Sequence, residues 1–166
     1  MLAMCYVGLR FLHFGALMLI FGNALYSVWF APSSLQRLMS RRFQSQQRMA
    51  ALISLVTALL MFMLQGGLMG NGWGDVVNPD IWRSVLGTQF GSVWLWQIIL
   101  AVLTAGTAWL APHKGSRLLL LAMGQFILLA GVGHATMNEG AVGALQRLNH
   151  ALHVLCAANW LGGLLP

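Results

Sequence analysis

Acidic residues are nearly absent from this sequence, which has three Asp and Glu among its 166 residues. Charged residues of both signs amount to 7%, whereas a soluble domain carries about 25%. This shortage excludes an ordinary soluble enzyme, a disordered chain and a coiled coil. The nine Lys and Arg give a formal charge of +6. They stand at the ends of apolar runs and form no basic patch, so we expect no nucleic-acid binding.

Cysteine and catalytic motifs are also scarce. Cys5 and Cys156 lie far apart in apolar surroundings, which excludes a disulfide framework and a paired cysteine metal motif. Each is expected to be a small buried apolar residue. The sequence has no nucleophile elbow, no phosphate loop and no HExxH motif, so we do not expect an enzyme.

Apolar residues dominate what is present, at 58% of the chain with a mean hydropathy of +0.74. A helix that crosses the hydrocarbon core of a bilayer needs about 20 mostly apolar residues. The sequence therefore predicts an all-α, polytopic transmembrane helix bundle in a lipid bilayer. We expect about five spans, near residues 5–30, 49–64, 91–111, 118–134 and 146–165.

The fifth expected span stops at Pro166 without the cations or aromatic residues that close a span. We therefore expect one transmembrane domain that begins a longer protein.

Gly8, Gly15 and Gly22 recur every seven residues in the first span. Such small residues let helix backbones approach closely in lipid, so we expect this glycine face to pack against another helix.

Positive charge predicts the orientation, because cytoplasmic loops of membrane proteins are enriched in Lys and Arg. Residues 31–48 hold four such cations and residues 112–117 hold two, whereas the other two connections hold Arg83 and Arg147. This bias places the first two segments in the cytoplasm and the N-terminus outside, which in a bacterium is the periplasm. His113, in the turn at 112–117, is expected to cap a helix end or to meet lipid headgroups.

The other four histidines fall on the expected outer side, at similar depth, although they come from three spans. His13 lies in the first span, His134 ends the fourth, and His150 and His153 share one face of the fifth because they are three residues apart. Ionisable groups within a span are costly and usually functional. Imidazole is the commonest metal ligand and suits copper, zinc, iron and nickel. We therefore predict that these four histidines form one metal site.

Four further residues are candidates for additional metal contacts. Met69 and Met137 lie near outer ends of spans and offer thioether sulfur, which Cu(I) accepts. Glu139 could orient an imidazole or neutralise the bound cation. Cys156 lies deeper on the same arc as His150 and His153.

Several segments resemble the bacterial copper resistance D family: residues 131–136 (GVGHAT), 149–153 (NHALH), 160–166 (WLGGLLP), 10–14 (RFLHF) and 65–70 (QGGLMG). The resemblance implies an inner-membrane protein of about eight spans that handles copper. It also implies a small periplasmic copper-binding partner of the CopC type and movement of copper from periplasm to cytoplasm. This chain corresponds to about the first half of that family. His13, His134, His150 and His153 match its pattern, whereas Met137 does not.

Three functions remain open at this point. The first is a copper-binding membrane permease component that takes Cu(I) or Cu(II). The second is an electron-transfer protein that holds haem b between His13 and His150 or His153, since such ligation needs two facing imidazoles. The third is a membrane scaffold whose histidines serve hydrogen bonds between helices.

Overall fold

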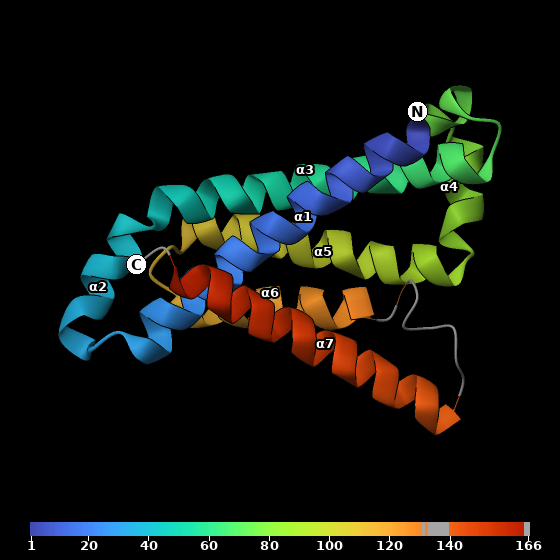
Figure 1. Cartoon of the computed structure of the whole chain (residues 1–166). Coiled ribbons are helices and arrows are strands. Elements are labelled where there is room, and N and C mark those ends of the chain that lie inside the picture. The colour runs from blue at the N-terminus through green and yellow to red at the C-terminus, as the bar shows by residue number, and fades with distance from the viewer. Residues whose placement is uncertain (131, 133–139, 165–166) are drawn as a thin grey trace.

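The computed structural model describes residues 1–130, 132 and 140–164, and all regular structure in that part of the chain is helical (Figure 1). The all-α prediction is therefore confirmed. In chain order the helices are α1 (Leu2–Leu25), the π-helix η1 (Tyr26–Phe30), α2 (Ser33–Arg42), α3 (Gln44–Met69), the 3₁₀-helix η2 (Trp73–Val77), α4 (Pro79–Leu86), α5 (Gln89–Leu110), α6 (Gly115–Ala130) and α7 (Gly140–Gly163).

Three of these segments are long and apolar enough to cross a membrane, namely Leu2–Phe30, Gln44–Met69 and Gln89–Leu110. The membrane bundle expected from composition is thus confirmed for these three. α6 is apolar but shorter. α7 has the length of a span but is not among the three candidate spans, so the expected fourth and fifth crossings stay predictions.

Two segments that the sequence analysis treated as loops contain helices. Residues 31–48 include α2 and the first turn of α3, and residues 65–90 include η2 and α4. The start of α4 has a clear local cause, because the side chain of Asn78 accepts a hydrogen bond from the backbone N–H of Asp80 and Pro79 follows directly. An Asn cap followed by proline is a strong signal for a helix start.

α1, α3, α5 and α6 run side by side and form a four-helix body, and α7 lies obliquely across it, mainly against α1 (Figure 1). α2 and the α5–α6 turn lie at one end of this body, which we call the α2 end. The N-terminus, η2 and α4 lie at the other end, which we call the α4 end. The six cations expected in the cytoplasm therefore share the α2 end.

The body is held together by large apolar side chains that interlock with alanines. Leu17, Ile20, Met61, Trp94 and Phe126 are almost completely buried. The ring of Phe126 meets that of Phe21 edge to face, with centroids 5.9 Å apart. Alanines on α3, α5 and α6 are buried beside them, so the helices approach closely, as is typical of bundles in lipid.

α7 touches α1 through a pair of glycines. A Cβ added to Gly22 would collide with the Cα of Gly162, and the reverse is also true. Gly8 and Gly15 instead face open space. Only one of the three regularly spaced glycines thus makes the close approach that their spacing predicted. The reason is that α7 crosses α1 obliquely and meets it closely at one point.

Candidate functional site

His13 lies at the centre of the four-helix body and has no exposed surface. It projects from α1 toward α3, where its Nδ1 is 3.1 Å from the carbonyl oxygen of Ser54 and 3.0 Å from the hydroxyl of Thr57. On the other side its Nε2 is 3.0 Å from the amide nitrogen of Gln97 on α5. A single imidazole therefore joins three helices.

The hydrogen-bond pattern fixes which ring nitrogen carries the proton. The Thr57 hydroxyl donates to the carbonyl oxygen of Ile53 at 2.6 Å, and the carbonyl of Ser54 accepts only. Nδ1 must therefore be the donor to this pair. Nε2 is then the nitrogen with a lone pair, which accepts from the NH₂ group of Gln97. This is the tautomer that a metal-binding histidine uses when its second nitrogen donates to a carbonyl.

The polar chain continues beyond His13 into a fourth helix. The amide nitrogen of Gln97 lies 3.3 Å from the side-chain oxygen of Gln125 on α6. Gln125 in turn donates to the hydroxyl of Thr104 at 2.9 Å, and Thr104 donates to the carbonyl of Leu100 at 2.7 Å. Gln97, Thr104 and Gln125 are completely buried. The result is a buried polar network that ties α1, α3, α5 and α6 together.

Trp94 packs against the imidazole one helical turn before Gln97. Its ring centroid is 5.9 Å from that of His13. Its indole N–H donates to the carbonyl of Ala58 at 2.8 Å, and Phe90 stacks on it at 5.0 Å. These contacts hold the indole in one orientation, so that it forms an apolar wall beside the imidazole.

Two residues that contact His13 each carry a buried oxygen without a hydrogen-bond partner in the described part of the chain, the hydroxyl of Ser54 and the side-chain oxygen of Gln97. An unsatisfied buried polar group costs about 1–3 kcal/mol. Oxygen and imidazole nitrogen are both atom types that ligate metal ions, so the chemistry of the atoms around His13 is compatible with a metal ion.

The histidines of α7 lie elsewhere. His150 is half-buried, whereas His153 and Cys156 are exposed. Among the described residues, no group of three or more His, Cys, Asp or Glu side chains is close enough to hold a metal ion. His134, Met137 and Glu139 lie outside the described residues. The structure thus does not bring His13 together with His150 and His153, and the four-histidine site stays a prediction.

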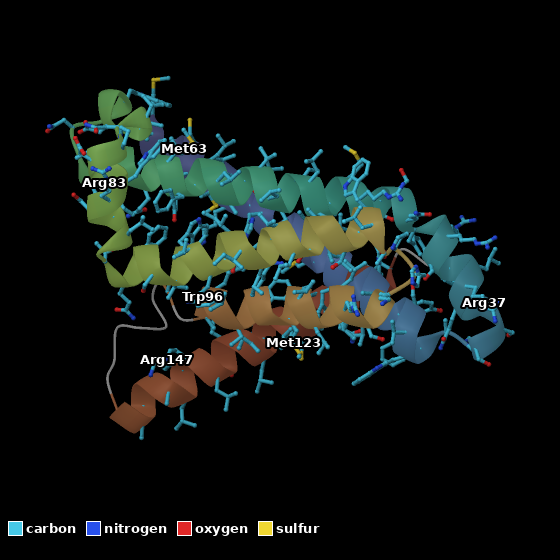
Figure 2. The ribbon with its side chains drawn as sticks, turned by 180° about the vertical axis from the view of Figure 1, so that it is seen from behind. Arg37, Met63, Arg83, Trp96, Met123 and Arg147 are labelled. Atoms are coloured by element: carbon cyan, nitrogen blue, oxygen red, sulfur yellow. The ribbon has the colours of Figure 1, made fainter. Side chains whose placement is uncertain are left out.

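The α4 end carries sulfur atoms on its surface. Met69 is the last residue of α3 and is 50% exposed. Cys5 is exposed rather than buried, so the expectation of two buried cysteines is wrong for both. Cys5 and Met63 line a groove of about 470 Å³ between α1 and α3, beside Trp73; Figure 2 shows Met63 at this end. A thiol and a thioether thus share one apolar groove.

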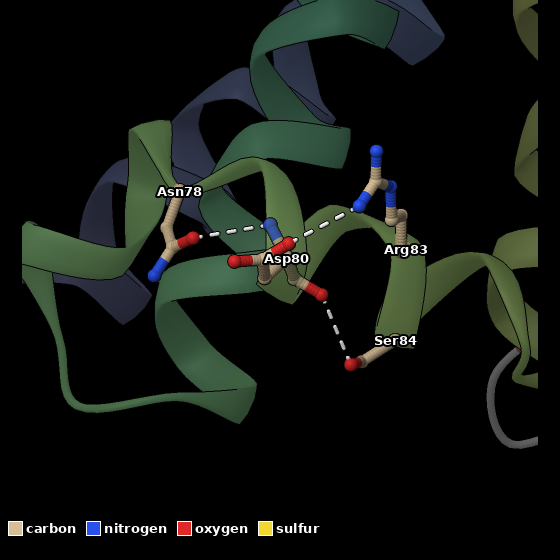
Figure 3. A network of polar contacts seen from close by, with 4 residues as sticks. All are labelled: Asn78, Asp80, Arg83 and Ser84. Carbon is tan, nitrogen blue, oxygen red and sulfur yellow. Dashed lines mark hydrogen bonds and ion pairs between the residues drawn. The ribbon is translucent and has the colours of Figure 1, made fainter.

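The acidic residues at the α4 end serve local structure (Figure 3). Asp80 pairs with Arg83 at 3.3 Å, and both side chains are more than four-fifths exposed. The hydroxyl of Ser84 donates to the carbonyl of Asp80 at 3.0 Å. Asp75 accepts from the side-chain amide of Asn78 at 3.3 Å. None of these contacts points toward acid–base chemistry.

The partners of His13 were not predicted from the sequence, because they are uncharged polar side chains rather than ionisable residues or strong metal ligands. A signal was available: uncharged polar residues interrupt the apolar runs of three helices. Ser54 and Thr57 are three residues apart on α3, and Gln97 and Thr104 are seven apart on α5. Both spacings place the two side chains on one helix face, where a buried hydrogen-bond network is expected.

Comparison with known proteins places the chain in a family. The family described as "Copper resistance protein D-like, N-terminal domain" matches residues 1–144. "Inner membrane protein YebZ" of Escherichia coli (strain K12) is 54% identical over 167 residues, which cover 100% of this chain. The chain spans 58% of the length of that curated relative. No solved structure matches the chain. The fold is thus an all-α membrane bundle, and the chain belongs to the copper resistance protein D-like family, whose N-terminal domain it matches.

Proposed function

We propose that this chain is a non-enzymatic copper-handling protein of the bacterial inner membrane, which binds copper ions and forms part of a path that moves them from the periplasm toward the cytoplasm. The family is described by copper resistance, and a relative is named as an inner membrane protein. The three membrane-spanning segments supply the setting. The buried imidazole of His13 supplies the ligand on which the proposal depends.

His13 is prepared to act as a ligand through Nε2. Its Nδ1–H is held by α3, which fixes the ring and leaves the Nε2 lone pair directed at Gln97. The Gln97 amide occupies the position of a metal ion, and it does so with its own side-chain oxygen unpaired. Turning that side chain exposes Nε2 and offers the oxygen as a second ligand. Copper then replaces one hydrogen bond and removes one unsatisfied group.

Soft ligands lie along the way from the α4 end to His13. Met61 is buried on the face of α3 that also carries Thr57, one turn closer to the α4 end. Cys5 and Met63 line the groove farther out. Thioether and thiolate sulfur select Cu(I). We propose that copper enters at this end, among Cys5, Met63 and Met69, and is passed inward.

The remaining ligands predicted from the sequence would act before copper reaches the groove lined by Cys5 and Met63. His134, His150 and His153 would accept copper from the periplasm, with Met137, Glu139 and Cys156 as additional contacts, and would pass it to that groove. The N-terminus would face the periplasm, where a CopC-type copper-binding protein would deliver the ion. The gathering of the expected cytoplasmic cations at the α2 end supports this orientation.

A copper titration tests the role of His13. The whole chain is purified in detergent, loaded with Cu(I) under ascorbate against a chromophoric competitor, and analysed for bound metal. His13→Gln keeps a polar side chain but removes the imidazole, and it should lower copper affinity at least tenfold. His113→Gln removes an imidazole at the α2 end and is the matched control, which should bind as the unmodified chain does. Unchanged binding by a folded His13→Gln protein would contradict the proposal.

A second variant keeps the test decisive if His13→Gln fails to fold. Gln97→Leu removes the side-chain oxygen that we propose as the second ligand and leaves His13 in place. Loss of one ligand interaction of about 1–1.5 kcal/mol should lower copper affinity about five- to tenfold. Unchanged or higher affinity would contradict a copper site formed by His13 Nε2 and the Gln97 oxygen.

Haem b is not favoured by the described residues. The haem hypothesis needed His13 to face His150 or His153, but His13 faces α3 and α5 while His153 is exposed on α7. The purified protein should therefore lack a Soret band, and a stoichiometric band would overturn this conclusion.

A further inference from the structure

The α2 end contains a second cavity, which has no role in the proposed copper path. Its volume is about 620 Å³, within the range of about 300–1,000 Å³ that small-ligand sites occupy. It lies between η1, α2 and the turn that leads into α6. Its basic lining residues come from two separate segments of the chain: Arg37, Arg41, His113, Lys114 and Arg117.

No carboxylate of the described residues lies among these cations. The lining contains no Asp or Glu. Of the three acidic residues in the chain, Asp75 and Asp80 lie at the α4 end and Glu139 lies outside the described residues. The salt bridge of the described residues, between Asp80 and Arg83, is also at the α4 end. Four positive side chains around one cavity repel one another, and an anion bound among them relieves that repulsion.

Neutral donors complete the lining. The hydroxyl of Ser27 is buried and has no hydrogen-bond partner among the described residues, and Ser27 lines the cavity. Ser40 and Ser116 add two more hydroxyls. The cavity also reaches Gly115, where α6 begins. The first N–H groups of a helix have no partner within it and favour anions.

The cavity wall is held in place. The side chain of Gln36 on α2 donates to the carbonyls of Val28 and Ala31, each at 3.1 Å. These two bonds fix α2 against the end of η1. Arg48, a nearby cation that does not line the cavity, instead donates a hydrogen bond from its guanidinium to the carbonyl of Ala108 near the end of α5. The four cations of the cavity have no carboxylate to hold them in the described chain.

We propose that this cavity binds a phosphate group, and that its source is the headgroup of an anionic phospholipid. Arginine recognises phosphate through paired hydrogen bonds, and basic pockets at the cytoplasmic ends of spans bind anionic headgroups. The exposed apolar side chains beside it favour lipid over free phosphate. Trp29 and Phe30 at the end of η1 are 73% and 59% exposed, and Leu38 on α2 is 61% exposed. These side chains offer the acyl chains an apolar surface next to the headgroup.

Native mass spectrometry of the whole chain, released from detergent after mixing with defined lipids, tests the proposal. Phosphatidylglycerol should stay bound, whereas phosphatidylcholine should be lost. The double variant Arg41→Gln/Arg117→Gln should retain at least tenfold less phosphatidylglycerol. Arg83→Gln/Arg147→Gln removes the same charge away from the α2 end (Figure 2) and should retain lipid like the unmodified chain. Equal loss in both double variants would overturn the site, because it would mean unspecific attraction to the total charge.

Competition with inorganic phosphate distinguishes a phospholipid headgroup from free phosphate as the ligand. Added alone at millimolar concentration, it should compete weakly with phosphatidylglycerol and raise the melting temperature little. Strong stabilisation by inorganic phosphate without retention of phosphatidylglycerol would reject the lipid and leave a site for free phosphate. Ser27→Ala removes one neutral donor and should lower retention about two- to fivefold, with no change in copper binding. The result is independent of copper, so failure of this proposal leaves the proposed function untouched.

Discussion

Polar side chains point inward in the body formed by α1, α3, α5 and α6, whereas on α7 they lie mostly on the exposed face. His13 is completely buried and both of its ring nitrogens have partners. His153 and Asn149 are exposed, and His150 is only half-buried. The same residue type therefore occupies two environments in one chain. In the body an imidazole joins three helices through hydrogen bonds, and on α7 the imidazoles lie half-buried or exposed at the surface.

The contrast teaches that depth in the membrane and direction around a helix axis are separate properties. From the predicted spans, His13, His150 and His153 are expected at comparable depth, yet His13 is buried in the body whereas His153 is exposed on α7. The depth of a residue follows from its place in an apolar run. Its direction follows from how the helix is rotated by packing, which here depends on Gly22 meeting Gly162 and on alanines inside the body.

Replacing His13 should have the largest effect on stability. His13→Ala leaves Gln97 and Thr57 without their partner and opens a cavity, so the free energy of unfolding should fall by about 3 kcal/mol. Titration with SDS in mixed micelles, followed by the near-ultraviolet circular dichroism of the tryptophans, measures this change. A loss below about 1 kcal/mol would mean that the buried network contributes no more than the polar residues of α7.

Separating α7 from the body should have the second largest effect. Gly162→Leu places a side chain where the backbone of Gly22 lies, and overpacking of this kind costs about 1–3 kcal/mol. A thiol placed by Ala158→Cys, in a chain with Cys5 and Cys156 changed to Ser, reports on the contact because Ala158 is buried.

That thiol should react slowly in the parent protein and at least tenfold faster after Gly162→Leu. Gly15→Leu adds the same side chain where the space around α1 is open, and it should leave the rate unchanged. Equal acceleration by both leucines would mean that the glycine pair does not hold α7.

Cutting the far end of the network should have a smaller effect. Gln125→Leu removes the acceptor of Gln97 but keeps similar volume, and Thr104 retains its bond to the carbonyl of Leu100. We expect a loss of about 1 kcal/mol in the same SDS titration. A loss as large as that of His13→Ala would mean that the network responds as one cooperative unit.

The smallest effect should come from α7 itself. His153→Ala truncates an exposed side chain, and such surface changes stay within about 0.5 kcal/mol. The unfolding curve should therefore overlay that of the unmodified chain. A destabilisation above about 1 kcal/mol would show that His153 has a partner in the intact protein. The polar residues of α7 would then contribute to stability as those of the four-helix body do.

The helices could be read from the sequence because the thickness of the bilayer sets how long an apolar run must be. The expected third span, 91–111, differs from α5 by two residues or fewer at each end. α4 was missed because it is short and follows Asn78 and Pro79, which also suit a turn. The second span was drawn too short, since α3 continues through polar residues at both ends.

The candidate site was harder to read than the helices. His13 stood out because an imidazole in an apolar run needs partners, but the sequence did not show which helices would supply them. Thr57 and Gln97 became its neighbours only through the order in which the helices pack. The cavity at the α2 end has the same origin, because Arg41 and Arg117 are far apart in the sequence and meet only after folding.

The hydrogen bonds of His13 also have a consequence for biosynthesis, because all of its partners are synthesised after it. Its two contacts on α3 are 41 and 44 residues farther along the chain, and Gln97 is 84 residues farther. Ribosomes add about 5–20 residues per second, so Gln97 emerges roughly 4–17 seconds after His13. Throughout that interval the first helix carries an incompletely satisfied imidazole. Until the third apolar segment is released into the lipid, the translocon or water at the membrane surface must supply the missing hydrogen-bond partner of this imidazole.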